Sequence, residues 1–197
     1  MDWGKNSNVK SHSKHDRFES VVRPHINALY QTAYRFCGNQ ADAEDLIQDL
    51  LLKLYPKYDE MLKIENLKSW MSRVLYHLYI DTIRQNDRRP DISAEIDPDT
   101  VLDELNTNGS SPEIELSNLL IQKDIYSAMQ NLNANQKALV VLHDIEEYTL
   151  PELSKMLETP VGTLKSRLHR ARASLRETLQ KRPYKMEPFA KIKRVIK

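Results

Sequence analysis

The sequence predicts an all-α protein with two small helical domains, an N-terminal helix bundle and a C-terminal helix-turn-helix, joined by an acidic flexible linker. Three observations support this prediction. Apolar residues recur at helical spacing over most of the 197 residues. The chain has only 4 glycines, which argues against a sheet protein with many tight turns. The helical pattern is interrupted between residues 90 and 115, where prolines and acidic side chains accumulate.

Three apolar stripes define the N-terminal domain, which we expect over residues 18–90 after a disordered segment at 1–17. The first stripe ends at Gly38 and contains Ile26, Leu29, Tyr30, Ala33, Tyr34 and Cys37. The second ends at Pro56 and contains Ala43, Leu46, Ile47, Leu50, Leu51, Leu54 and Tyr55. The third contains Leu67, Trp70, Met71, Val74, Leu75 and Leu78. Three helices of this length can bury a shared core.

Charge is distributed unevenly along the rest of the chain. Residues 91–122 carry eight acidic groups and no Lys or Arg, and we expect a linker at 91–115. Residues 160–197 carry twelve Lys and Arg against two Glu. This basic end contains the last part of the second domain, expected at 116–181, and a basic tail at 182–197. Such asymmetry suggests a polyanionic partner, although a solvated basic helix would look the same.

The sequence of the second domain contains two patterns typical of the first residues of a helix. Thr149 and Glu152 have the spacing of a capping box, and Thr159 before Pro160 predicts a second capped start. The helix that follows keeps an apolar face of Val161, Leu164, Leu168, Ala171 and Leu175. Polar and basic residues near its start occupy the remaining surface: Thr163, Lys165, Ser166, Arg167, His169 and Arg170. A short helix, a tight turn and a longer basic helix indicate a helix-turn-helix that reads DNA.

Leu52 does not fit the apolar stripe of its own helix. With 100° per residue and Ala43 at zero, it falls at about 180°, beside Asp45, Gln48 and Asp49. A single exposed leucine needs no explanation. An apolar anchor ringed by polar side chains is, however, typical of a protein interface.

The segments ADAEDLIQDLLLKLY and NLKSWMSRVLYHLYIDTIRQNDRR resemble the N-terminal domain of extracytoplasmic-function sigma factors of the sigma-seventy family. LNANQKALVVLHDIEEYTLPELSKMLETPVGTLKSRLHRARASLRETL resembles the promoter-reading C-terminal domain of the same family. The resemblance covers about residues 18–90 and 116–180, in order and with fitting lengths. It implies a subunit that binds core RNA polymerase and directs it to promoters, with no cofactor and no catalytic residue of its own.

The resemblance also implies roles for particular residues. Core polymerase, through its largest-subunit clamp helices and its flap region, is the implied partner, with Asp45, Gln48, Asp49 and Leu52 on the clamp-binding surface. Contacts to the minus-10 element are implied for Arg73, Tyr76, His77, Arg84, Arg88 and Arg89. Contacts to the minus-35 element are implied for Thr163, Lys165, Ser166, Arg167, His169 and Arg170. His77 departs from the family, which commonly has asparagine there.

Several other classes of function are not supported by the sequence. Cys37 is the only cysteine, and there is neither a metal-ligand cluster, nor a glycine-rich phosphate loop, nor a nucleophile with a base beside it. No secretory signal or membrane-spanning stretch is present, so we expect a cytoplasmic protein without stable membrane insertion or a small-molecule substrate.

Two alternatives remain open at this stage. A stand-alone helix-turn-helix regulator would bind duplex DNA without polymerase, but it has no use for the N-terminal domain. An adaptor that binds no DNA leaves the basic C-terminal end unexplained. If the chain is a sigma factor, we expect an anti-sigma protein as a further partner.

Overall fold

The computed structural model describes residues 13–86 and 124–180, and every regular element in these two ranges is helical. The N-terminal helix group contains α1 (Lys14–Cys37), α2 (Gln40–Leu54), η1 (Tyr55–Lys57), α3 (Tyr58–Met61) and α4 (Leu67–Asn86). The C-terminal helix group contains a helical segment at 124–130, α6 (Ala134–Val140), η3 (Val141–Ile145), α7 (Leu150–Met156) and α8 (Val161–Gln180). The all-α prediction is confirmed for these residues; the predicted linker and basic tail lie outside them.

Helix α1 has a defined cap at each end. The Ser13 hydroxyl accepts from the Asp16 amide and the Asp16 carboxylate accepts from the Ser13 amide, which forms a capping box. At the other end Gly38 adopts φ 85°, and its N–H donates to the Tyr34 carbonyl. The expectation that residues 1–17 are disordered is therefore wrong from Ser13 onward, because this cap starts the helix at Lys14, four residues before the expected domain start at residue 18.

Helices α1, α2 and α4 pack against one another and bury a common core. Its fully buried side chains include Leu29, Phe36, Leu50, Leu54, Met71 and Leu75. Phe36 stacks on Tyr79 with ring centroids 4.9 Å apart, which joins α1 to α4. Tyr55, assigned to the core stripe from the sequence, is instead 39% exposed, because α2 ends at Leu54 and the chain turns there into η1.

The C-terminal helix group contains the predicted helix-turn-helix, which is formed by α7 and α8. Thr149 and Glu152 form the expected capping box at the start of α7. The expected cap of α8 is wrong: the Thr159 hydroxyl donates backward to the Leu157 carbonyl, and α8 begins at Val161. In the turn between the helices Glu158 has φ 50°, a left-handed conformation that favours glycine or asparagine.

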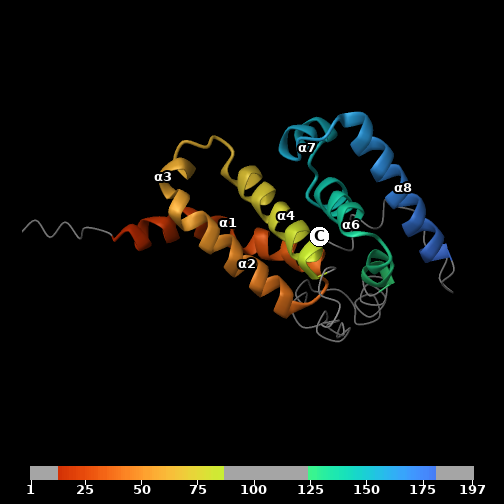
Figure 1. Ribbon diagram of the computed structural model, residues 1–197, viewed down its shortest axis with the longest axis horizontal. Helices are drawn as coiled ribbons and strands as arrows, with labels where there is room; N and C mark the ends of the chain where they lie inside the picture. Colours follow the sequence, from red (N-terminus) through yellow and green to blue (C-terminus); the bar gives the residue numbers. More distant parts are fainter. Residues whose placement is uncertain (1–12, 87–123, 181–197) are drawn as a thin grey trace, which may run out of the picture.

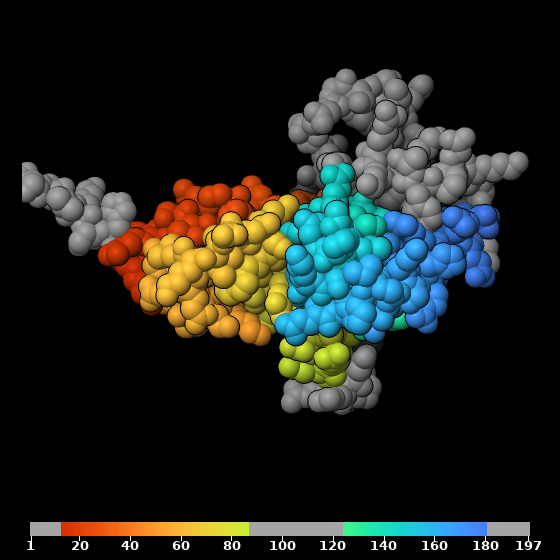
Figure 2. Space-filling model, turned by 90° about the horizontal axis from the view of Figure 1, so that it is seen from above, coloured from red at the N-terminus to blue at the C-terminus, as the bar shows by residue number. Residues whose placement is uncertain are grey.

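The two helix groups lie side by side, with α4 and one end of α1 next to the C-terminal helix group (Figure 1). Contacts join α1 to α6 and η3, and α4 to α6 and α7. The buried apolar residues of the two groups form one cluster. The space-filling view shows the yellow α4 surface directly against the cyan and blue C-terminal helix group (Figure 2).

Candidate nucleic-acid interface

Helix α8 presents its basic face outward because its apolar face is fixed to the C-terminal helix group. Leu164, Leu168, Ala171 and Leu175 are buried as predicted. Val161 is 40% exposed, so its assignment to this face is wrong; the first turn of the helix extends beyond the core. Lys165, Ser166, His169 and Arg170 are exposed, whereas Thr163 and Arg167 are half-buried. The outward residues form a short row of donors and cations suited to a DNA groove.

Helix α4 brings together four of the six residues predicted to contact the minus-10 element. Tyr76 and Arg73 are half-buried, and the His77 ring lies edge-on to the Tyr76 ring at 5.2 Å. Arg84 is exposed and lies 3.8 Å from the Asp81 carboxylate. Arg88 and Arg89 lie outside the described residues. The described four form a surface of cations and rings, which is the combination that single-stranded DNA requires.

Burial shifts the pKa values of two side chains on the α4 surface, His77 and Tyr76. Burial, assisted by the nearby Arg73 charge, lowers the pKa of His77, so the imidazole is neutral at pH 7 and can both donate and accept a hydrogen bond. Burial raises the pKa of Tyr76, although the charges of Arg167 and Arg84 oppose this. The phenol therefore stays protonated near neutral pH.

The outward face of α2 carries the four residues predicted to bind polymerase. Asp45, Gln48 and Asp49 are exposed, and Leu52 has 74% of its surface exposed. The predicted exposure of Leu52 is confirmed; its role stays a prediction. Tyr55 extends the same apolar surface and was missed as a candidate. The helical wheel contained the signal, because Tyr55 falls at about 120° from Ala43, outside the core stripe.

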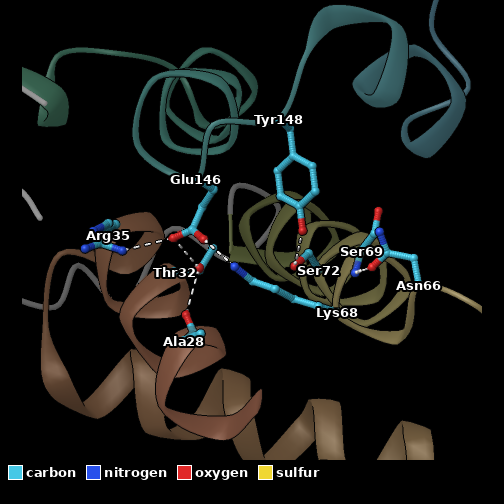
Figure 3. A network of polar contacts seen from close by, with 9 residues as sticks. All are labelled: Ala28, Thr32, Arg35, Asn66, Lys68, Ser69, Ser72, Glu146 and Tyr148. Atoms are coloured by element: carbon cyan, nitrogen blue, oxygen red, sulfur yellow. Dashed lines mark hydrogen bonds and ion pairs between the residues drawn. The ribbon is translucent and has the colours of Figure 1, made fainter. Parts of the chain in front are cut away.

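A buried ionic contact, not predicted from the sequence, joins the two helix groups at Glu146 (Figure 3). One carboxylate oxygen accepts from the Thr32 hydroxyl and from Arg35 Nη1, both at 3.0 Å. The other oxygen lies 3.4 Å from Lys68 Nζ. The side chains of Glu146 and Arg35 are each only 10% exposed. A single carboxylate thus binds donors from both α1 and α4.

Four further contacts continue along α4. Tyr148 donates to the Ser72 hydroxyl at 3.3 Å, as Figure 3 also shows. Tyr76 donates to Asn135 Oδ1 at 3.1 Å. The Arg73 guanidinium pairs with the Glu158 carboxylate, and the Ser69 hydroxyl lies 3.8 Å from Met156 Sδ. Two of the predicted minus-10 residues, Arg73 and Tyr76, are therefore occupied by the C-terminal helix group.

In the described part of the chain, no three His, Cys, Asp or Glu side chains lie close enough together to hold a metal ion. A search of the same residues finds no helix with the length and apolarity needed to cross a membrane. The geometry instead offers three surfaces: the α8 basic face, the α4 surface and the α2 outward face.

The sequence matches two family descriptions, one in each helix group. Sigma-70 region 2 matches residues 21–89 and Sigma-70, region 4 matches residues 122–175. Among similar proteins, the ECF RNA polymerase sigma factor SigW of Bacillus subtilis is 31% identical over 170 residues, covering 84% of this chain and 90% of that protein. ECF RNA polymerase sigma factor SigE of Mycolicibacterium smegmatis is 32% identical over 164 residues, covering 83% of this chain and 62% of that protein.

These matches span both helix groups in the order in which the chain carries them. The chain belongs to the extracytoplasmic-function sigma factors of the sigma-70 family, and it is an RNA polymerase sigma factor. A stand-alone helix-turn-helix regulator is not favoured. Such a regulator would not need the N-terminal domain, whereas in a sigma factor that domain is region 2.

Two solved structures share the fold. The sigma factor RpoE of Bartonella quintana, solved with the anti-sigma factor NepR, superposes with a TM-score of 0.63 at 24% identity, covering 84% of this chain and 98% of that chain. CnrH, solved with the cytosolic domain of CnrY, gives a TM-score of 0.54 at 21% identity, covering 86% of this chain and 91% of that chain. At these identities the likeness concerns the fold alone.

Proposed function

We propose that this sigma factor binds core RNA polymerase through the outward face of α2, captures the minus-10 element with α4 and reads the minus-35 element with α8. The observation that carries the proposal is Leu52. A leucine with 74% of its surface exposed, ringed by Asp45, Gln48 and Asp49, has no role in its own core. It has the composition of an interface anchor with a polar rim.

The clamp helices of the largest polymerase subunit are the partner that the family resemblance implies for this face. Tyr55 lies three residues after Leu52 and packs edge-on against Phe18, with ring centroids 5.2 Å apart. That packing holds the Tyr55 ring in place, so little side-chain entropy remains to be lost on binding. We therefore add Tyr55 to the proposed anchor.

On α4, the proposed minus-10 contacts are Arg73, Tyr76, His77 and Arg84, with Arg88 and Arg89 from the sequence alone. Rings stack on unpaired bases, and guanidinium groups bind phosphates. His77 replaces the asparagine common in the family. A neutral imidazole offers one donor and one acceptor, so it can hydrogen-bond a base edge, with a preference different from that of asparagine.

On α8, the proposed minus-35 contacts are Thr163, Lys165, Ser166, Arg167, His169 and Arg170. They occupy the first half of the helix, which is the part of a recognition helix that reaches base edges. The Ser166 hydroxyl already donates to the Thr163 carbonyl at 2.9 Å, which leaves its lone pairs available to accept. Arg167 and Arg170 suit the paired acceptors of guanine.

The proposal extends to the domain organisation and to the cellular setting. We assign residues 18–90 to a region 2 domain, 91–115 to a linker and 116–181 to a region 4 domain. The protein acts in the cytoplasm, where polymerase and DNA are, and it performs no catalysis itself. An anti-sigma protein is a further proposed partner, since both fold neighbours were solved with a partner and that of RpoE is an anti-sigma factor.

Substitution of Leu52 tests the proposal directly. We expect Leu52→Asp to keep the helical content and unfolding temperature of the wild type, because the side chain is outside the core. The variant should fail to co-elute with core polymerase and should not support promoter-specific initiation. Leu62→Asp is the matched control: Leu62 is also exposed, at 58%, but it follows α3 in the chain and is not part of α2. Normal core affinity in Leu52→Asp would remove the α2 face from the proposal.

A further inference from the structure

The first turn of α1 lies against the Tyr55 ring, next to the proposed polymerase anchor. The Ser13 capping box starts this helix at Lys14, whereas the region 2 match begins only at residue 21. Lys14 Nζ lies 5.6 Å from the centroid of the Tyr55 ring. Phe18, about one turn further along and only 7% exposed, packs edge-on against the same ring at 5.2 Å. The first turn therefore holds an exposed ammonium group beside the anchor.

We propose that the first turn of α1 belongs to the surface that docks on core polymerase, and that Lys14 meets a carboxylate of the polymerase there. The inference rests on the proposed function of the α2 face. It extends that face beyond the residues that the family resemblance implied. The added residues lie in a part of the chain that the region 2 match does not include.

The size of a protein interface is the first argument. A stable interface buries about 800 Å² on each partner, which is a patch roughly 30 Å across. A helix rises about 1.5 Å per residue, so Tyr55 lies only about one turn beyond Leu52. The Lys14 ammonium group is 5.6 Å from the Tyr55 ring. A partner that covers both Leu52 and Tyr55 with a patch of this size therefore also reaches Lys14.

The distribution of charge around the anchor is the second argument. Asp45 and Asp49 precede Leu52 on α2. Lys14 lies at Tyr55, which comes after Leu52. These three charged side chains are exposed, and none of them forms an ion pair with another described residue. The anchor thus has carboxylates towards the start of α2 and an ammonium group towards its end, and a partner of complementary charge can dock in one direction only.

The position of Lys14 over an aromatic ring indicates what kind of group it meets on docking. The Tyr55 ring attracts the ammonium group through its quadrupole, which does not neutralise the charge. When a partner covers the ring, water leaves the ammonium group, and a desolvated cation needs an anionic partner. A carboxylate is the anion that a protein surface supplies. A carboxylate of the polymerase is therefore the expected partner of Lys14.

The affinity for core polymerase, measured without DNA so that no phosphate can contribute, tests the proposal. Full-length variants carrying a fluorophore are titrated with core polymerase at low and at high salt. We expect Lys14→Met to weaken binding about threefold and Lys14→Glu about tenfold at low salt, because an exposed ion pair is modest and like charges repel. Both losses should shrink at high salt, which screens exposed charges. Circular dichroism should show the helical content of the wild type.

Lys63→Glu is the matched control. It makes the same charge change at an exposed lysine of the same helix group, but Lys63 follows α3 in the chain and is part of neither α1 nor α2. This variant should bind core polymerase as the wild type does. A loss equal to that of Lys14→Glu would show that net charge decides the affinity, and the proposal would be wrong. A loss in Lys14→Glu that stays the same at high salt would overturn the polymerase carboxylate.

The outcomes separate this proposal from the proposed function. If Leu52→Asp loses core binding while both Lys14 variants bind as the wild type does, the first turn lies outside the docking surface and the α2 face stands. If Leu52→Asp and both Lys14 variants all bind normally, the α2 face is wrong, and the proposal fails with it. Dimers of the wild type that Lys14→Glu disperses would assign the first turn to contact with a second copy of the chain, which also overturns the proposal.

Discussion

Arg172 of α8 donates through Nε to the Asp144 carboxylate at 3.0 Å and pairs through Nη2 with its second oxygen. Asp144 is only 6% exposed, so this bidentate pair fixes the recognition helix to η3. We expect Arg172→Ala to lower the free energy of unfolding by about 2 kcal/mol, below the usual range for a buried pair because Arg172 is 38% exposed. Chemical denaturation measures the loss. Arg170→Ala, on the outward face, should leave stability unchanged; equal losses in both variants would contradict this.

Arg167→Ala should weaken minus-35 recognition and leave core binding intact. The side chain lies in the first half of α8, and a good bidentate base contact discriminates by about 1–3 kcal/mol. Transcription from matched promoters with intact and altered minus-35 elements provides the measurement. Arg176→Ala serves as a control, since it removes a cation from the same helix more than two turns further on. The prediction is wrong if the wild type and Arg167→Ala respond identically to a mutated minus-35 element.

Thr149→Ala should lower the free energy of unfolding by about 1 kcal/mol, the usual effect of losing a capping hydroxyl. The effect should depend on pH. Hydrogen bonds from the Thr149 hydroxyl and amide hold the pKa of Glu152 below its usual value. A depressed carboxyl pKa stabilises the fold above the unfolded-state pKa and loses that effect as pH falls through the folded value. The difference between Thr149→Ala and wild type in thermal unfolding should therefore shrink from pH 7 to acid pH. A constant difference would show that the Glu152 contact is not involved.

Gly38→Ala should destabilise the protein by about 1–2 kcal/mol, since φ 85° is unfavourable for any residue with a Cβ. An added Cβ would also collide with the Gln130 amide, which accepts from Lys137 Nζ at 2.7 Å. Thermal unfolding gives the magnitude. Combining Gly38→Ala with Gln130→Ala should recover the part of the loss that comes from the collision. Additive losses in the double variant would show that backbone strain alone is responsible.

Periodicity in the sequence was sufficient to predict the helices that build each group. The apolar stripes in the sequence correctly predicted where α1, α2, α4 and α8 lie. Each stripe recurs at helical spacing and so marks the side of the helix that faces the core. The same wheel predicted correctly that Leu52 is exposed. Errors fell at helix ends, where one or two local hydrogen bonds decide the boundary: Ser13 starts α1 early, and Thr159 bonds backward rather than capping α8.

The contact between the helix groups could not be predicted in this way. Thr32 and Glu146 are 114 positions apart in the chain, and no local pattern specifies which of many glutamates meets which cation. The positions of Glu146, Asn135 and Glu158 depend on how two independently capped units pack. The sequence does contain an unusual residue at this contact, since Glu158 occupies a turn position that glycine or asparagine would fit better. That mismatch can be recognised only once the backbone conformation is known.

The left-handed Glu158 sets the stability of its own turn against an ion pair that joins the two helix groups. Replacing it with glycine relieves the turn by roughly 1 kcal/mol and removes the carboxylate from Arg73 in the same step. A laboratory screen for heat resistance would therefore show which effect is larger: enrichment of Glu158→Gly would mean that relief of the turn outweighs loss of the ion pair with Arg73.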